Sequence, residues 1–229
     1  RAVFNYAIKH GRARINPVSS VKPLPVPPGR EKFLQDDESI ARLIGAASDR
    51  DREHLRPIII AALQTGCRKG ELFSMRWEDV DLVSEPGIIH IRDSKNNTTH
   101  NVYVDSVLRK VLKDQRKWQM RKGIRSEWVF CGPDGKKLKS VKSSWRAACK
   151  RAGLVGSDGK PNLHFHDLRH TFASRHVMGG TPLFTVSQLL NHKNPAQVKR
   201  YAHLSPAYRQ EVAKKNAALA QGWVALLKK

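Results

Sequence analysis

Apolar residues recur at the three- to four-residue spacing of an amphipathic helix over much of the chain. Ile40, Leu43 and Ile44 share one face of a predicted helix, which either of the aspartates before it can cap. Residues 54–64 are more uniformly apolar, which predicts a buried helix that ends at Gly66. The same reasoning predicts helices at residues 2–10, 69–75 and 107–121, the last with a basic polar face.

Short β-rich runs interrupt this helical pattern in the middle of the chain. Residues 88–92 and 101–104 flank a polar loop and predict a hairpin, and residues 128–130 predict a short strand before a Gly-Pro-Asp-Gly turn. From residue 141 onward the pattern is mostly helical, with breaks near residues 153–161, 179–180, 194–195 and 206. The sum predicts an α+β fold, mainly α with a small antiparallel sheet.

A proline-rich stretch divides the chain near its beginning. Five prolines fall between Asn16 and Gly29, a density that excludes a helix or a sheet interior and favours an extended linker. We therefore expect a stub of one domain at residues 1–16, a linker at 17–30 and a second domain at 31–229. The chain opens without an initiator Met or a signal peptide, so we expect a piece of a longer protein.

The charge of the chain is strongly positive and unevenly spread. It has 42 Lys and Arg against 20 Asp and Glu, a formal net charge of +22. Residues 1–105 carry +2 of this and the rest of the chain carries +20. Such a field attracts polyanions, and nucleic acid is the leading candidate because neutralised phosphates release counterions. A solvated basic surface, or a basic face on anionic lipid, remains an alternative.

Composition excludes several other classes. The longest apolar run, residues 58–63, is far below the ~20 residues of a membrane span. The 3 cysteines are widely spaced without a CxxC pair, which argues against a disulfide scaffold or a cysteine-rich zinc site and favours a reducing compartment.

Two segments combine arginine with other chemically active side chains. In Thr65-Gly66-Cys67-Arg68-Lys69-Gly70-Glu71, Arg68 follows a helix-ending glycine, and Glu71 lies one turn on, where it can brace the guanidinium; an ordinary surface pair is the alternative. His166, Arg169 and His170 share a helix face. The two histidines have the spacing of a zinc pair, but Arg169 on that face would repel a cation. The cluster fits an anionic substrate better.

Three more polar residues stand at positions where chemistry is possible. His192 falls at a helix end before a proline, a place where capping histidines are common. Tyr201 is flanked by basic residues, although most tyrosines only pack. Lys95 lies in the predicted hairpin loop, where a solvated lysine is the simple alternative.

Taken together, the order and spacing of these residues resemble the tyrosine recombinases, the phage-integrase family of site-specific recombinases. The resemblance covers about residues 31–215, and the segment before the linker resembles the end of the family's core-binding domain. Asn191 replaces the usual glycine before the histidine, and no Thr pair precedes the tyrosine. The family's catalytic positions read Arg68, Lys95, His166, Arg169, His192 and, nine residues further, Tyr201.

The resemblance implies a catalytic-domain fold and a reaction. Tyr201 would attack a DNA phosphodiester and form a 3′-phosphotyrosyl link, with neither ATP nor a metal. Both arginines and His192 would bind the phosphate oxygens. His166 would accept the phenolic proton, and Lys95 would protonate the leaving 5′-oxygen.

The resemblance also implies supporting residues, partners and a location. Glu71 and Asp167 would brace Arg68 and the histidine helix, and His170 would pack beneath the site. Double-stranded DNA is the implied partner, bound by a homo-tetramer that can be a monomer when free in solution, for integration or excision of a mobile element. The protein would be bacterial or phage-encoded, cytoplasmic and associated with the nucleoid, with no membrane partner. The helical tail at residues 212–229 would pack on its own domain or dock on another subunit.

Three alternatives remain open. A type IB topoisomerase shares this chemistry but relaxes DNA as a monomer. A DNA-binding regulator without catalysis would explain the charge but not the ordered residues. A zinc hydrolase would explain only His166 and His170.

Overall fold

The computed structural model describes residues 1–22, 24, 32–48, 53–93, 98–192 and 194–205. The chain divides into two compact units, residues 1–31 and residues 32–229. The first unit holds α1 (Ala2–Lys9), which buries no side chain and ends before Gly11, whose φ of +67° is the left-handed conformation of a helix end. The guanidinium of Arg1 donates to the carbonyl oxygens of Val18 and Val21, which ties the following segment to this helix.

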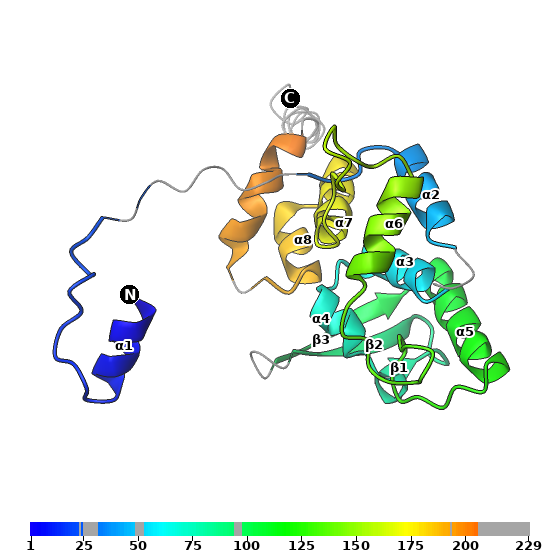
Figure 1. Cartoon of the computed structure of the whole chain (residues 1–229), viewed down its shortest axis with the longest axis horizontal. Helices are drawn as coiled ribbons and strands as arrows, with labels where there is room; N and C mark the ends of the chain where they lie inside the picture. Colours follow the sequence, from blue (N-terminus) through cyan, green and yellow to red (C-terminus); the bar gives the residue numbers. More distant parts are fainter. Residues whose placement is uncertain (23, 25–31, 49–52, 94–97, 193, 206–229) are drawn as a thin grey trace, which may run out of the picture. The chain divides into compact units, whose positions relative to one another are not determined.

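The second unit is helix-rich and carries one small sheet, as the sequence predicts (Figure 1). Its helices are α2 (Asp37–Ala46), α3 (Leu55–Thr65), α4 (Lys69–Phe73), α5 (Ser106–Arg121), α6 (Lys142–Arg151), α7 (Asp167–Met178), α8 (Leu183–Leu189) and the 3₁₀ helices η2 (Trp77–Asp79) and η3 (Pro195–Leu204). Its strands are β1 (Val80–Asp81), β2 (Gly87–Asp93) and β3 (Thr98–Val104).

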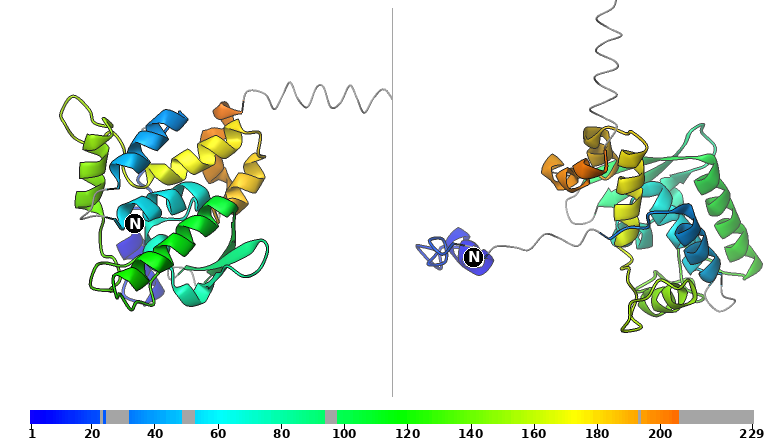
Figure 2. Two further views of the ribbon diagram at one scale, coloured as in Figure 1. Left: turned by 90° about the vertical axis from the view of Figure 1, so that its right-hand side faces the viewer. Right: turned by 90° about the horizontal axis from the view of Figure 1, so that it is seen from above.

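Helix α3 lies at the centre of this unit. Leu55, Ile58, Ile59 and Ala61 on α3 have no exposed surface, which confirms the predicted buried helix. It packs against α5 and α7, which flank it in Figure 2, and also against α2 and α4. A helix apolar on nearly all sides requires neighbours on nearly all sides, and this arrangement provides them.

The predicted hairpin is present and its strands are longer than expected. β2 and β3 pair antiparallel from Gly87 opposite Val104 to Asp93 opposite Thr98. β1 pairs with the other edge of β2, giving the order β1-β2-β3. A strand of two residues has too short an alternating pattern to be predicted from sequence.

The predicted strand at residues 128–130 is wrong. Trp128 forms only an isolated bridge with Arg76. The side-chain amide of Gln119 on α5 donates to the carbonyl oxygen of Trp128 at 2.9 Å, and that of Gln115 donates to Val129 at 3.1 Å. The carbonyl oxygens of this segment thus accept hydrogen bonds from helix side chains instead of from a neighbouring strand. The residues are therefore buried without forming a β-ladder.

The apolar side chains form two clusters, which we call the large core and the small core. The large core contains apolar side chains from all the helices from α2 through α6, from the sheet and from the start of α7. Its fully buried side chains include Leu43, Ile59 and Phe130. The small core lies between α7, α8 and η3 and consists of Phe172, Ala173, Val177, Val186, Leu190, Val198 and Tyr201. None of the helices in the described ranges combines the length and hydropathy needed to cross a membrane.

Candidate active site

Arg169 on α7 joins the ends of two other helices. Its Nη1 donates to the carbonyl oxygen of Gly66 at 2.7 Å, and its Nη2 donates to that of Leu190 at 2.5 Å. The residue is 5% exposed, and burial, together with the neighbouring Arg68, lowers the pKa of the guanidinium to about 10. It therefore stays protonated at neutral pH. Since backbone carbonyls carry no net charge, this buried cation retains its attraction for an anion.

Gly66 makes this approach possible. Its φ is +63°, and a Cβ at this position would lie 2.6 Å from Cδ1 of Phe172 and 2.8 Å from Cδ2 of Leu190. A side chain would thus be strained and would push α7 and α8 away. The glycine that ends α3 also fixes the distance between α3 and the small core.

Arg68 and Glu71 form a half-buried pair at the start of α4. The Glu71 carboxylate accepts from the backbone N–H of Arg68 at 2.6 Å and from its Nη1 at 2.7 Å. The Glu71 side chain is 6% exposed and that of Arg68 is 40% exposed. Both oxygens of one carboxylate therefore hold the arginine by its backbone and its side chain, and the guanidinium still reaches solvent. The alternative of an ordinary surface pair is wrong for Glu71.

The histidines of α7 meet the tyrosine of η3. His166 lies at the N-cap of α7, and its ring packs edge-on against that of His170 with 5.2 Å between the centroids. His170 Nδ1 and the Tyr201 hydroxyl are 2.5 Å apart, a short hydrogen bond. The sequence interpretation had His170 packing beneath the site, whereas the structure places its ring nitrogen on the tyrosine oxygen. Tyr201 is 6% exposed.

These imidazoles are neutral at pH 7. Burial, with a further contribution from His166, lowers the pKa of His170 to about 4. Burial and the charge of Arg169 also lower the pKa of His166. Asp167 Oδ2 accepts from the backbone N–H of His164 at 2.8 Å, so this carboxylate fixes the entry into α7.

His192 follows α8, two residues after Leu190, whose carbonyl oxygen accepts from Arg169. Burial, with the charge of Arg169, lowers the pKa of His192 to about 4. Its Nδ1 is buried and has no hydrogen-bond partner within the described part of the chain. Asn191 before it has a φ of +47°, a conformation that glycine adopts readily and asparagine tolerates. The departure from the family's glycine therefore keeps the turn, and the asparagine amide donates to His100 Nδ1 at 3.0 Å.

Two predicted features lie outside the described residues. Lys95 falls in the loop between β2 and β3, and the helical tail falls in residues 206–229. Their roles stay predictions.

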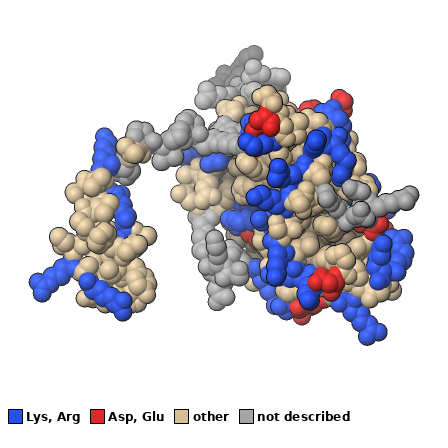
Figure 3. Space-filling view, in the orientation of Figure 1, with Lys and Arg blue, Asp and Glu red and all other residues tan. Residues whose placement is uncertain are grey.

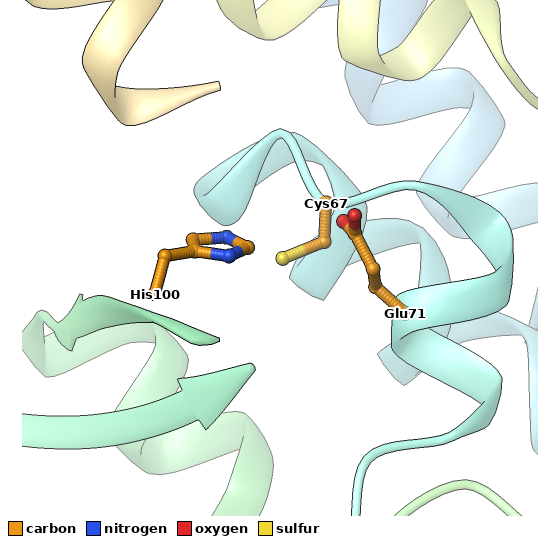
Figure 4. Close-up of side chains that lie close together, drawn as sticks. All are labelled: Cys67, Glu71 and His100. Atoms are coloured by element: carbon orange, nitrogen blue, oxygen red, sulfur yellow. The ribbon is translucent and has the colours of Figure 1, made fainter. Parts of the chain in front are cut away.

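Histidine, cysteine and carboxylate side chains are the usual protein ligands of a metal ion. Among the described residues, the one group of at least three such side chains is Cys67, Glu71 and His100, whose ligand atoms lie within 4.8 Å of one another (Figure 4). This group contains neither His166 nor His170, the two histidines with the spacing of a zinc pair. Both Glu71 oxygens already accept from Arg68, and burial raises the pKa of the Cys67 thiol to about 12. The donor set thus fits a packed contact better than a metal ion.

Basic side chains cover much of the surface of the second unit on the side drawn in Figure 3. Some are fixed on aromatic rings: the Arg116 guanidinium lies 4.8 Å from the Trp77 ring centroid, and Arg76 and Lys137 both lie 4.9 Å from that of Trp128. Aromatic contacts of this kind hold positive charge in place instead of leaving it on free side chains.

The arrangement has a definite chemical capacity. Two guanidinium groups can bind the oxygens of an anion, and neutral imidazoles can exchange protons with a phenol. Arg68, Tyr201 and Arg169 interact electrostatically across this space. Sequence reasoning missed His100 and the contact of His170, because both depend on pairings between distant segments.

Comparison with known proteins identifies the family. A model described as "Phage integrase family" matches residues 32–207. The integrase of Salmonella phage P22 is 32% identical over 198 residues, which cover 81% of this chain and 47% of the relative. The shufflon-specific DNA recombinase of Escherichia coli is 29% identical over 205 residues, with 89% and 48% covered. The chain spans about half the length of these curated relatives.

Solved structures show the same fold. The XerA recombinase has a TM-score of 0.62 at 25% identity, covering 94% of this chain and 74% of that one. The Tn1549 transposon integrase, solved with transposon right end DNA, has a TM-score of 0.69 at 18% identity, covering 96% and 76%. With its helix-rich unit, small antiparallel sheet and family match, the chain belongs to the phage integrase family, and residues 32–207 are a tyrosine recombinase catalytic domain.

Proposed function

We propose that the chain is the catalytic part of a site-specific DNA recombinase that cuts and rejoins DNA through Tyr201. One observation carries the proposal: the Tyr201 hydroxyl lies 2.5 Å from the Nδ1 of a half-buried, neutral imidazole, and Tyr201 is near enough to the buried Arg169 to favour its charged form. A phenol that serves only packing does not need this polar environment.

The arginines supply the charge that the reaction requires. Attack on a phosphodiester places additional negative charge on the non-bridging oxygens in the transition state. Arg169 is already held by two carbonyls and Arg68 by Glu71, so neither has to reorganise when the phosphate binds. Preorganised cations of this kind stabilise the transition state more than mobile ones. We propose that His192 donates a further hydrogen bond to a phosphate oxygen.

The covalent step conserves the energy of the phosphodiester. The Tyr201 oxygen bonds to phosphorus, the bond to the 5′-oxygen breaks, and Lys95 gives that oxygen a proton. The product is a 3′-phosphotyrosyl link and a free 5′-hydroxyl, which rejoins by the reverse path without ATP. Strand exchange requires several such sites, so we propose a homo-tetramer on DNA.

Charge and relatives support DNA as the partner. The net charge is +22, and relatives include phage integrases and a shufflon-specific recombinase. Solved neighbours include a lambda integrase dimer bound to a core site. We propose that this chain binds duplex DNA and serves integration or excision of a mobile element, with residues 1–16 as the end of a core-binding domain.

The test traps the covalent intermediate on a mixture of DNA fragments, so the recombination site does not have to be identified first. Nicked fragments of source DNA are incubated with the protein, denatured, and recovered through protein attached to their 3′ ends. We expect fragments that share one sequence to accumulate with the wild-type chain and none with Tyr201→Phe. Recovery of equal amounts with both proteins, or of no adduct with either, contradicts the proposal.

A further inference from the structure

We propose that His170 takes the phenolic proton of Tyr201 during strand cleavage and returns it during rejoining. This inference rests on the proposed function, and it gives the role of proton acceptor to His170 instead of His166, the residue that the family resemblance implies. It makes His170 a catalytic residue, since the imidazole touches the attacking oxygen.

The geometry favours His170. Its Nδ1 lies 2.5 Å from the Tyr201 oxygen, within the distance over which a proton passes directly. The two rings are 6.0 Å apart and inclined by 50°, so the contact is made through the nitrogen and not by stacking. His166 packs against the His170 ring, with an angle of 88° between their planes. The edge-on contact places His166 beside the His170 ring, as a neighbour that orients it.

Charge also favours a neutral His170 before DNA binds. Burial, His166, Arg200 and Arg169 all favour the neutral imidazole, and Asp167 alone among the contributing groups favours the charged one. A neutral imidazole has a free lone pair that accepts the phenolic proton. A bound phosphate would offset the nearby arginines and raise the basicity of His170 when the proton must be taken. The groups that face His170 are His166, Asp167 and Arg169 from α7 and its cap, and Arg200 and Tyr201 from η3.

Each proton that moves during cleavage returns to its original group during rejoining. In cleavage, the proton moves from the Tyr201 oxygen to His170 Nδ1 as the phosphorus–oxygen bond to Tyr201 forms. The bond to the 5′-oxygen breaks, and Lys95 supplies a proton to that oxygen. In rejoining, the 5′-hydroxyl returns its proton to Lys95 and the imidazolium returns its proton to the departing phenolate. No further reactant is required.

A first experiment needs no DNA. In ¹⁵N-histidine NMR spectra of the whole chain, His170 should titrate near pH 4 and show the Nε2–H tautomer, with Nδ1 hydrogen-bonded. Tyr201→Phe should shift the His170 Nδ1 resonance towards that of a free nitrogen. An Nδ1–H tautomer, or an unchanged resonance in the variant, would overturn the proposal whether or not the protein cuts DNA.

A second experiment measures cleavage of the trapped site under single turnover. We expect His170→Ala to cleave about 10²–10⁴-fold more slowly than wild type, the usual contribution of a general base. Between pH 7 and 9 its rate should rise about tenfold per unit, because the phenolate must then form unaided and only a small fraction of an ordinary phenol, with a pKa near ~10, is ionised in this range. The wild-type rate should change little over this range.

A tyrosine analogue with a more acidic hydroxyl distinguishes a catalytic role of His170 from a structural one. When 3,5-difluorotyrosine replaces Tyr201, the proton leaves more readily, so His170→Ala should recover most of its rate. A substrate with a 5′-thiol leaving group should not rescue it, since that substrate relieves only the need for an acid. His176→Ala is the matched control: His176 also lies on α7, is half-buried and has a pKa lowered by burial, but its ring contacts Thr181 and Phe172 instead of Tyr201, so this variant should cleave much faster than His170→Ala.

The outcomes are distinct. If His170→Ala stays slow with difluorotyrosine, or if His166→Ala and not His170→Ala is rescued by it, His170 is not the acceptor. If the wild-type chain forms no adduct at all, the proposed function fails, and the NMR result still decides the contact.

Discussion

The large core and the small core of the catalytic domain differ in what they are made of. The large core is formed by apolar side chains from α2 through α7 and from strands β2 and β3, and it surrounds α3. The small core has seven buried members, and one of them is Tyr201. The Tyr201 hydroxyl is hydrogen-bonded to His170. The carbonyl oxygen of Leu190, another member of the small core, accepts a hydrogen bond from Arg169.

This difference shows how the fold divides its tasks. The large core supplies most of the buried apolar area and therefore most of the stability. The small core places reactive groups, and its packing sets the position of the nucleophile. Changes in the large core should therefore affect unfolding, and changes in the small core should affect cleavage more than unfolding.

The largest effect is expected in the large core. Ile59→Ala removes a fully buried side chain from α3 and leaves a cavity. The free energy of unfolding should fall by about 2–5 kcal/mol, measured by urea denaturation. Where the variant is still folded, its cleavage rate should stay close to wild type. A loss below ~1 kcal/mol would contradict the central place given to α3.

A smaller change in stability, with a larger one in rate, is expected from Val198→Ala. Val198 is 4% exposed and lies three residues before Tyr201 in η3, so both share one face of the 3₁₀ helix. Unfolding should cost about 1–2 kcal/mol less than in wild type. Cleavage should slow by about 10–100-fold, because small displacements of a reacting group are costly. DNA affinity, measured by gel shift, should be unchanged; equal losses of affinity and rate would contradict this view.

Glu71→Gln should slow cleavage by about tenfold. The amide keeps one hydrogen bond to Arg68 but loses the charge that holds its guanidinium, a charge-assisted bond of about 1.5–3 kcal/mol. Glu78→Gln is the matched control, since Glu78 also pairs with arginines but its side chain is 58% exposed. Single-turnover cleavage of both variants decides the matter. If Glu78→Gln slows cleavage as much as Glu71→Gln does, the buried Glu71 carboxylate has no special role in holding Arg68.

A further effect is a dependence of stability on pH that arises near the small core. The pKa values of His170 and His192 lie at about 4 in the folded chain, below the ordinary 6.5. Between these values the unfolded chain binds protons that the folded chain does not, so the free energy of unfolding should fall as pH drops from 6.5 to 4. Urea denaturation of His192→Gln should show a weaker dependence than wild type. An identical dependence would assign the effect to other groups.

The sequence predicts the helices well because their apolar faces repeat locally. The prediction at residues 54–64 is confirmed by α3, and the hairpin by β2 and β3. The predicted strand at residues 128–130 is wrong because its carbonyl oxygens accept from the side chains of Gln115 and Gln119, glutamines on a helix that precedes it. No local pattern records such a partner.

The site shows the same limit. Arg68 and Glu71 are three residues apart, and their contact could be foreseen from helical spacing. The choice between His166 and His170 could not, since the two histidines are only four residues apart, one at the N-cap of α7 and the other at the start of the helix. It depends on where η3 returns to α7, which is a property of the small core. The role of Asn191 likewise required its φ and its contact with His100.

One measurement tests the central claim most directly: the identity of the residue that carries the DNA. The sequence has 4 tyrosines, and Tyr208 lies only seven residues beyond Tyr201, outside the described residues. The trapped adduct is digested with protease and nuclease, and the modified residue is located by fragmentation in a mass spectrometer. The account predicts a nucleotide on Tyr201, with the adduct lost in Tyr201→Phe and kept in Tyr208→Phe. A nucleotide on Tyr208, or on any other residue, would contradict it.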